Sequence, residues 1–253
     1  MRKYLSIAAV AAATLASPAF AQDGEDDWNG AYVGVHAGYN GLKSDSAVAL
    51  SGAWTTESTT LQNEVTSRWG TSQSIDDMNF GAQIGYNFNA GGAVLGVEAD
   101  FSVLNGSDVR SSTQASTAFP ALSYTYGNTV DPKHAISVRA KLGLPMGKTL
   151  FYAHGGWQTV RADVGATILS NGNYSKAAAV TENFDGYTVG AGIEHKLGSN
   201  ISARLEYAYS DLGDVSYVTA YRAGSAFTSP AYNETFTQDM RMHSVRLGVN
   251  FHF

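Results

Sequence analysis

Charged residues recur at every second position in four short segments of this chain, and a fifth segment adds one more arginine. Side chains two residues apart on a β-strand point to the same face, so each pair shares one side of its strand. Together they comprise four acids and five bases: Glu98, Asp100, Arg139, Lys141, Glu194, Lys196, Arg204, Glu206 and Arg246. Such a set suits either a packed network of ion pairs or the charged lining of a channel for small solutes.

The near balance of charge favours the network. A charge moved from water into a narrow interior must be paired, because an orphaned one costs several kcal/mol. If these segments are strands that follow one another around a sheet, the charges fall into two groups of neighbours. Glu206 would pair with Arg204 and Arg246. Glu98 and Asp100 would pair with Arg139 and Lys141 of the next strand. A gated small-solute porin remains the alternative.

No constellation for catalysis or metal binding stands out. The six histidines lack the spacing of metal ligands, so we predict neither a metal site nor a cofactor. A lipid A-modifying enzyme needs His and Ser on one lipid-facing side, but the adjacent His243 and Ser244 point to opposite faces. An outer-membrane protease needs acid–histidine pairs, and Asp211 and Asp214 have no histidine nearby in sequence. We predict no catalytic residues, and an enzyme remains the less favoured alternative.

The final eleven residues show most clearly what kind of element positions these charges. Apolar residues occupy every second place: Val245, Leu247, Val249, Phe251 and Phe253. Polar residues and one glycine fill the places between. The same alternation recurs in seven earlier segments, near residues 31–40, 79–88, 95–103, 136–143, 151–158, 187–196 and 201–209. Eight strands with one apolar and one polar face are typical of an outer-membrane barrel, with lipid outside and a polar lumen inside.

The connections between these segments alternate in length. Residues 89–92, 144–148 and 197–200 form short turns, whereas 41–77, 104–134, 160–184 and 210–240 are long and rich in Ser, Thr, Gly and Asn. Short periplasmic turns and long surface loops are the arrangement of an up-and-down outer-membrane barrel. We therefore predict an all-β protein, an eight-stranded antiparallel up-and-down transmembrane β-barrel with four long surface loops.

The long connections also carry aromatic residues, among them Trp54, Trp69, Phe119, Tyr124, Tyr126, Tyr174, Tyr217, Tyr221, Phe227 and Tyr232. Two interpretations are open. The rings pack the loops against one another above the barrel, or they recognise a partner at the cell surface.

The N-terminus predicts export. Residues 1–21 combine two basic residues, an apolar run and a small-residue cleavage site at Ala19-Phe20-Ala21, so we interpret them as a signal peptide and 22–253 as the barrel domain. Removing Arg2 and Lys3 from the 16 basic residues leaves 14 against 22 acidic ones, a net charge of −8. An acidic chain without a basic cluster argues against nucleic acid as a partner.

Four stretches carry a family resemblance: Tyr32-Val-Gly-Val-His-Ala-Gly-Tyr39, Phe80-Gly-Ala-Gln-Ile-Gly-Tyr-Asn-Phe88, Arg204-Leu-Glu-Tyr-Ala-Tyr-Ser-Asp211 and the final strand. They resemble the OmpA-like barrels, and more narrowly the opacity-type surface antigens of the porin family of alphaproteobacteria. The resemblance covers the signal peptide and all eight strands, but not the long loops.

This resemblance implies a location in the cell outer membrane and a role in envelope integrity. It further implies that Val249, Phe251 and Phe253 form a signal read by the barrel assembly machinery. The partners we expect are outer-membrane lipids, lipopolysaccharide and that machinery, with a host or haemin ligand at the loops. We expect a monomer.

Overall fold

The computed structural model describes residues 27–253, and the predicted signal peptide lies outside the described residues. Most of the described chain is strand. The elements are β1 (Gly30–Gly52), η1 (Ala53–Thr56), α1 (Thr59–Trp69), β2 (Ser72–Asn89), β3 (Val94–Leu104), β4 (Asp108–Ala115), β5 (Ser123–Met146), β6 (Thr149–Ser170), β7 (Ser175–Lys196), β8 (Ile201–Val218), β9 (Ala220–Tyr221) and β10 (Tyr232–His252). Within residues 27–253 no helix has the length and apolar character needed to span a membrane.

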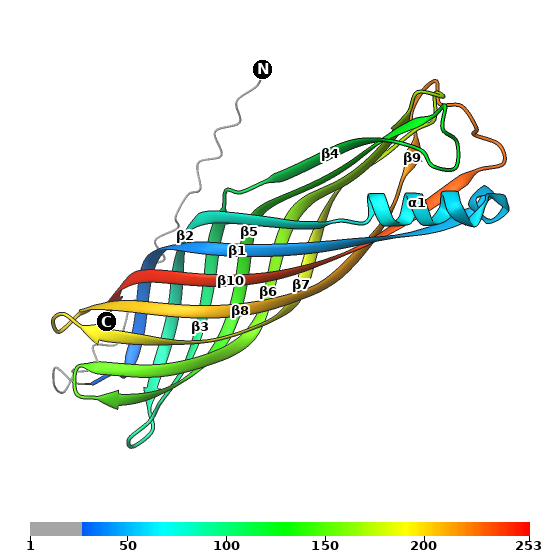
Figure 1. Ribbon diagram of the computed structural model, residues 1–253. Helices are drawn as coiled ribbons and strands as arrows, with labels where there is room; N and C mark the ends of the chain where they lie inside the picture. The colour runs from blue at the N-terminus through cyan, green and yellow to red at the C-terminus, as the bar shows by residue number, and fades with distance from the viewer. Residues whose placement is uncertain (1–26) are drawn as a thin grey trace.

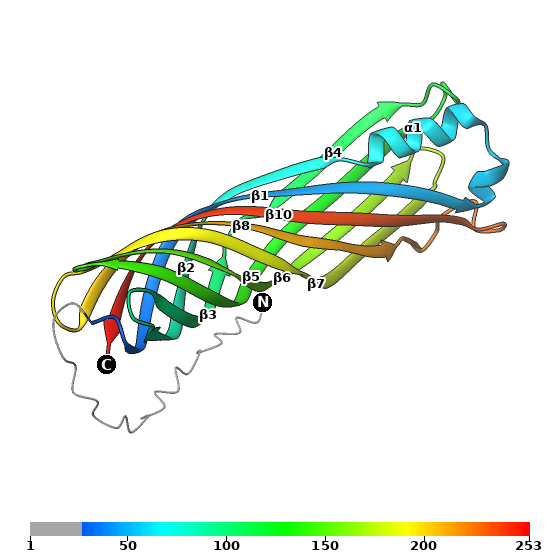
Figure 2. The ribbon, with the colours of Figure 1, turned by 90° about the horizontal axis from the view of Figure 1, so that it is seen from below.

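Eight of the strands close into an antiparallel ring, which confirms the predicted fold class. The order around the ring is β1, β2, β3, β5, β6, β7, β8 and β10, and β10 pairs back onto β1. The shorter strand β4 pairs with the upper half of β5, above the place where β3 ends. All three short turns lie at the end of the barrel that holds the C-terminus, and α1 lies at the other end (Figures 1 and 2). We call these the periplasmic and outer ends.

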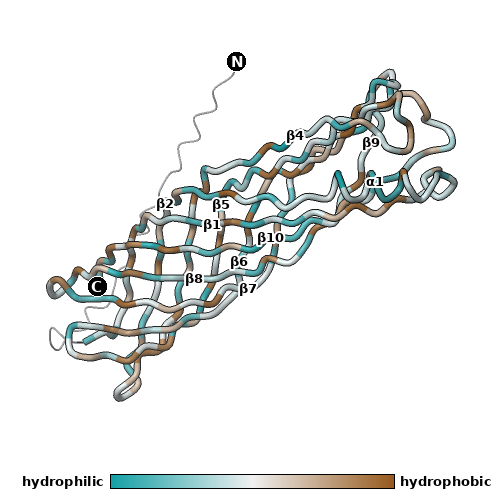
Figure 3. Tube along the Cα trace, viewed as in Figure 1, coloured by the Kyte–Doolittle hydropathy of each residue, from teal (hydrophilic) through white to brown (hydrophobic). Residues whose placement is uncertain are grey.

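The predicted inside and outside faces are confirmed in the lower part of the barrel. Apolar and polar residues alternate along the strands, as Figure 3 shows. The apolar residues of the final strand are exposed, from 46% for Phe251 to 65% for Leu247, whereas Ser244, Asn250 and His252 between them are buried. Exposed rings form two girdles, with Trp157 and Tyr187 toward the outer end and Phe151 and Phe251 toward the periplasmic end.

The four long connections lie at one end, as predicted, but most of their residues continue the strands. β5, β6 and β7 extend far beyond the apolar belt, and the loop between β6 and β7 is only a short turn near Asn173. We call the folded region above the belt the cap. Its interior is a hydrophobic core around Trp69, Val65, Phe184 and Phe236, with contributions from β1, α1, β5, β6, β7, β8 and β10.

The polarity of the strands inverts between barrel and cap. On β6, Phe151 and Trp157 face outward below, at odd positions. Above them the even positions are apolar and buried: Val160, Ala162, Val164, Ala166 and Ile168. An outward face that meets lipid must be apolar, whereas one that meets water can be polar and leave apolar side chains for the core.

Candidate functional site: a lumen closed at two levels

The lumen of the barrel is filled by a balanced ion-pair network centred on Glu206. Its carboxylate accepts hydrogen bonds from Arg139 at 2.8 Å, Arg204 at 2.6 Å and the Tyr152 hydroxyl at 2.9 Å, and it also pairs with Arg246. Glu206 is 2% exposed. Three guanidinium groups on three different strands therefore converge on one carboxylate.

Glu98 and Asp100 extend the network across the lumen. Glu98 pairs with Arg139 and, at 2.6 Å, with Arg204 of the opposite wall. Asp100 pairs with Arg246 at 3.0 Å and with His36 at 2.7 Å. The predicted pairs of Glu206 with Arg204 and Arg246, and of Glu98 with Arg139, are present. Asp100 pairs with Arg246 rather than with a base of the next strand, so the prediction of two separate groups is wrong. Arginine is long enough to cross a narrow barrel, so pairs such as Glu98 with Arg204 connect opposite walls.

The remaining predicted charges lie nearer the periplasmic end. Glu194 lies 3.8 Å from Lys141 and accepts hydrogen bonds from Ser202 at 2.5 Å and Asn250 at 2.7 Å. Lys196 belongs to a separate contact, donating to the backbone carbonyl of Asp27 and lying 5.1 Å from the Trp28 ring centroid. The central set thus contains four acids, Glu98, Asp100, Glu194 and Glu206, and four bases, Arg139, Lys141, Arg204 and Arg246.

Glycines make room for the large side chains of this set. A Cβ added at Gly85 would lie 2.4 Å from the Tyr32 ring, and one at Gly192 would lie 2.5 Å from the Tyr152 ring. Tyr32 donates a hydrogen bond to Glu98 at 2.6 Å. The glycines on the polar faces of these strands are therefore packing positions for tyrosines that bind the network.

Trp28 closes the periplasmic end of the lumen. It is 1% exposed, packs with Val94, Leu150 and Tyr152, and donates through Nε1 to the Gly147 carbonyl at 3.4 Å. This residue lies just before β1, outside the stretches of alternating polar and apolar residues. Its role was missed for that reason.

Two small hollows lie above the network. They are lined by residues such as Asn40, Asn79 and Met242 and have volumes of about 10 Å³ each, room for roughly one water molecule. The hydrophobic core of the cap follows directly above. The barrel is therefore closed by ion pairs at one level and by apolar side chains at the next.

Another buried carboxylate holds the top of the cap. Glu234 is 0% exposed and accepts hydrogen bonds from Trp54 at 2.8 Å, Tyr174 at 2.5 Å and Thr219, while pairing with Lys176. Trp54 belongs to η1 and Lys176 to β7. Tyr174 lies just before β7, and Thr219 lies between β8 and β9. The contact ties together three of the four connections that were predicted to be loops.

Helix α1 is anchored by Glu64 between β1 and the tip of β4. Glu64 accepts hydrogen bonds from the Thr117 hydroxyl at 2.7 Å and backbone at 2.8 Å, and pairs with Arg68 at 2.8 Å. Burial alone would raise the pKa of Glu64, but the bonds from Thr117 and the charge of Arg68 outweigh it and hold the pKa below its usual value.

Most of the cap aromatics pack against one another. Trp54, Trp69, Tyr124, Tyr126, Tyr174 and Tyr217 are buried, and Tyr221 and Tyr232 are partly buried against the core. Two are exposed, Phe119 at 43% and Phe227 at 62%. The packing interpretation is thus correct for eight rings, and only Phe119 and Phe227 keep the exposure that recognition requires.

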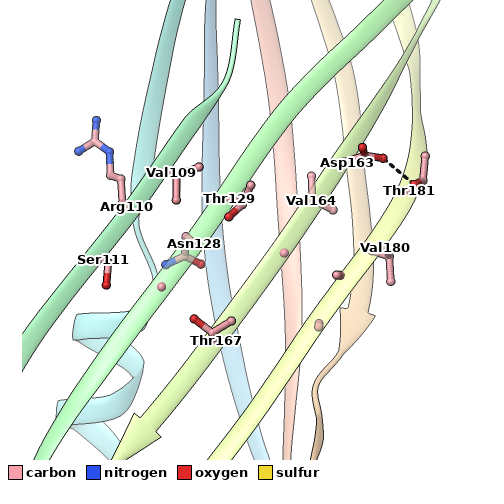
Figure 4. Close-up of a pocket in the computed structure, with 14 residues that line it drawn as sticks. Val109, Arg110, Ser111, Asn128, Thr129, Asp163, Val164, Thr167, Val180 and Thr181 are labelled. Atoms are coloured by element: carbon pink, nitrogen blue, oxygen red, sulfur yellow. Dashed lines mark hydrogen bonds between the residues drawn. The ribbon is translucent and has the colours of Figure 1, made fainter. Parts of the chain in front are cut away.

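Another hollow lies away from the lumen. It is a shallow groove of about 580 Å³ across β4, β5, β6 and β7 of the cap (Figure 4). Its lining includes the exposed residues Val109, Ser111, Ala179 and Thr181, and at its edge Asp163 accepts a hydrogen bond from Thr181 at 2.5 Å.

Comparison with known proteins agrees with this architecture. The model of the outer membrane protein beta-barrel domain matches residues 7–253. The 31 kDa outer-membrane immunogenic protein of Brucella melitensis biotype 1 is 27% identical over 235 residues, which cover 89% of this chain and 84% of the relative. The 22 kDa outer membrane protein of Rhizobium leguminosarum bv. viciae is 32% identical over 176 residues, covering 69% and 66%. OprG of Pseudomonas aeruginosa aligns over 91% of this chain and 100% of its own, with 11% identity and a TM-score of 0.49.

Proposed function

Because this chain belongs to the outer membrane protein beta-barrel domain family, we propose that it is a sealed barrel that supports the envelope and presents a folded cap at the cell surface. One observation carries the proposal: the two closures lie in series along the barrel axis. A solute that passed the hydrophobic cap core around Phe236 would next meet the ion pairs of Glu206.

The porin alternative requires a continuous polar passage. An eight-stranded barrel is just wide enough for side chains to fill it, and here four acids and four bases occupy that width. Transient opening would have to separate buried ion pairs, and breaking one such pair costs about 3–5 kcal/mol. We therefore favour the seal.

We further propose that the protein is not an enzyme. Both relatives named above are called outer-membrane proteins. His243 faces outward near the outer girdle. Its Nδ1 shares a 2.7 Å hydrogen bond with the Tyr207 hydroxyl, and its partner is therefore not a serine nucleophile. That contact suits an aromatic belt at the membrane surface.

The surface role is assigned to the cap. The Brucella relatives are named immunogenic proteins, and we propose that the cap of this chain is likewise accessible to antibodies. Phe119 and Phe227 are the aromatic residues that a host protein or haemin would meet first, because both are exposed near turns of the cap. Insertion by the barrel assembly machinery through Val249, Phe251 and Phe253, and a monomeric state, complete the proposal.

Single-channel recording in planar bilayers tests the seal. We expect no steady openings from the wild type at neutral pH, and none from Arg241→Ala, which removes an exposed arginine of the same strand as Arg246. Arg246→Ala should also stay closed, because the cap core remains intact. Steady wild-type openings would overturn the sealed barrel in favour of the porin.

A further inference from the structure

Strand β4 of the cap wall has one neighbouring strand among the described residues. It pairs with β5 along residues 108–115, and the sheet ends there. β3 pairs with β5 lower down and ends at Leu104. Helix α1 lies on the inner side of β5, where the carbonyl of Trp69 accepts a hydrogen bond from Asn128 at 3.0 Å. One long edge of β4 is therefore left without a partner strand.

The backbone groups of β4 alternate in direction, as in any antiparallel pair. The N–H of Ser116, just beyond the strand, donates to the Leu122 carbonyl at 2.9 Å, so the even-numbered residues point toward β5. The carbonyl of Ala115 instead accepts a hydrogen bond from Arg68 of α1 at 2.9 Å. The odd-numbered residues therefore point away from β5, and they are Val109, Ser111, Thr113 and Ala115.

The middle of this edge is open. The side chains of Gln73 and Arg68 hold the two ends of the strand through its carbonyl groups. Between these contacts, in the part of the chain that the structure describes, nothing bonds to the outward N–H and C=O groups of Val109, Ser111 and Thr113. A row of unpaired backbone groups is a template for pairing with another strand.

β4 lacks the features that usually block a free edge. Natural edge strands are protected by lysine, by proline or by a bulge. β4 contains neither residue, and its register with β5 runs from 108 to 115 without a shift. Its one basic residue, Arg110, is paired with Asp108 of the same strand at 2.8 Å. The edge is therefore accessible to a second strand.

β4 adds no side chain to the core of the cap. Residues 109–115 are all exposed, with Val109 at 70%, and none of them belongs to the hydrophobic core. Figure 4 shows this part of the strand with Val109, Arg110 and Ser111. Beside the edge the outer face carries small residues, including Ser111 and its ladder partner Gly127. These leave room for the side chains of an added strand.

A second copy of β4 in the same membrane does not fit this edge. Two upright barrels that pair symmetrically are related by a twofold axis along the membrane normal. With strands tilted by about 40°, the two β4 strands would cross at roughly 80°, far from the antiparallel alignment of a ladder. A free peptide segment has no such constraint.

We propose that the free edge of β4 binds an extended peptide segment of another protein at the cell surface by strand addition. Outward N–H and C=O groups at every second residue match a polypeptide strand, which offers the same groups at the same spacing. Main-chain hydrogen bonds supply the affinity, and the small residues beside the edge accept many side chains. This inference rests on the exposed cap of the proposed function, and it is independent of whether the lumen conducts.

Random dodecapeptides displayed on phage and selected on the full chain in detergent are the probe, and fluorescence anisotropy measures the binding of the enriched peptides. Ser111→Pro removes one outward N–H at a position where an edge strand tolerates proline. This variant should bind the peptides roughly tenfold more weakly or worse. Ser111→Ala is the matched control, because it removes the hydroxyl and keeps the N–H, and it should bind as the wild type does.

Amide hydrogen exchange separates a loss of binding from a loss of structure. The amides of Ser112 and Gln114 point toward β5 and should stay protected in Ser111→Pro, which shows that β4 still pairs. In the wild type, the amides of Val109 and Thr113 should gain protection when a peptide binds.

Equal binding by the folded Ser111→Pro variant, or an equal loss in Ser111→Ala, would overturn the proposal, because recognition would then not depend on the backbone. A selection that enriches no peptide, or pairing of two copies through β4 in detergent, would overturn it as well. A conducting wild type would refute the seal and leave these results unchanged.

Discussion

Removing the carboxylate of Glu206 is the most direct test of the lumen network. In Glu206→Ala the arginines Arg139, Arg204 and Arg246 lose their common partner, and the balanced central set gains one net positive charge. Tyr152 loses its acceptor in the same step. All of this occurs in the buried interior of the barrel.

The size of the effect follows from what remains. Arg139 and Arg204 keep Glu98, and Arg246 keeps Asp100, so no guanidinium is left wholly unpaired. Breaking a buried pair costs about 3–5 kcal/mol, and the surviving partners place the expected loss near 3 kcal/mol. Arg241→Ala, which breaks an exposed pair with Asp239, should cost about 0–1 kcal/mol.

Equilibrium unfolding from lipid vesicles, followed by tryptophan fluorescence and gel mobility, measures these values. The double variant Glu206→Ala with Arg246→Ala restores charge balance. It should therefore lose less stability than the sum of the two single changes, by at least about 1 kcal/mol. The reasoning is refuted if Glu206→Ala costs no more than Arg241→Ala, or if the two single effects simply add.

Three further predictions concern faces, assembly and pH. Ala99→Arg places a charge against lipid and should cost about 2–4 kcal/mol, whereas Ser102→Arg meets Asp100 inside and should differ clearly; equal losses in refolding titrations would mean that the two faces are wrongly assigned. Phe253→Gln should lower surface levels far more than it lowers the stability of refolded protein, and normal levels on intact cells would contradict the assembly role. The pKa of Glu64 is lowered in the folded state. Its ionised carboxylate therefore contributes to the stability of the fold above its unfolded pKa of about 4.3, and this contribution is lost as pH falls through the folded pKa. The hydrogen-exchange protection of α1, corrected for the intrinsic exchange rate at each pH, should fall on acidification, and Glu64→Gln should abolish that fall.

Sequence periodicity predicted the barrel because lipid imposes a strict rule on one face. The residues at positions such as Leu247 and Val249 face lipid and must be apolar, and the residues between them face the lumen and must suit its polar interior. The position of each lumen charge could therefore be read from parity, and all nine predicted side chains are buried in the structure.

The partners of those charges on other walls could not be predicted, because they depend on distances across the barrel. Parity gives the face of Arg204, but not that its guanidinium reaches Glu98 on the far wall. Neighbouring strands were the only contacts that sequence order could suggest. Likewise, Lys176 and Glu234 lie far apart in the chain and meet only because β7 and β10 continue into the cap.

The cap itself left a signal that a search for lipid-facing alternation misses. On β6, apolar residues occupy odd positions up to Trp157 and even positions from Val160 onward. Polar residues and glycine appear at the odd positions of the upper part, so the alternation continues with its faces exchanged. A strand that changed its surroundings from lipid to water would show this inversion and no other break.

The inversion also explains why the two closures differ in chemistry. Within the membrane the apolar residues are needed outside, so the interior of a narrow barrel is left with polar side chains and must pair them. Above the membrane the outer face meets water, and the apolar residues are free to form a core around Phe236 and Trp69. Each closure uses the residues that its surroundings leave available. A change in bilayer thickness should therefore disturb the boundary near Arg161 and Arg241 before it disturbs either closure.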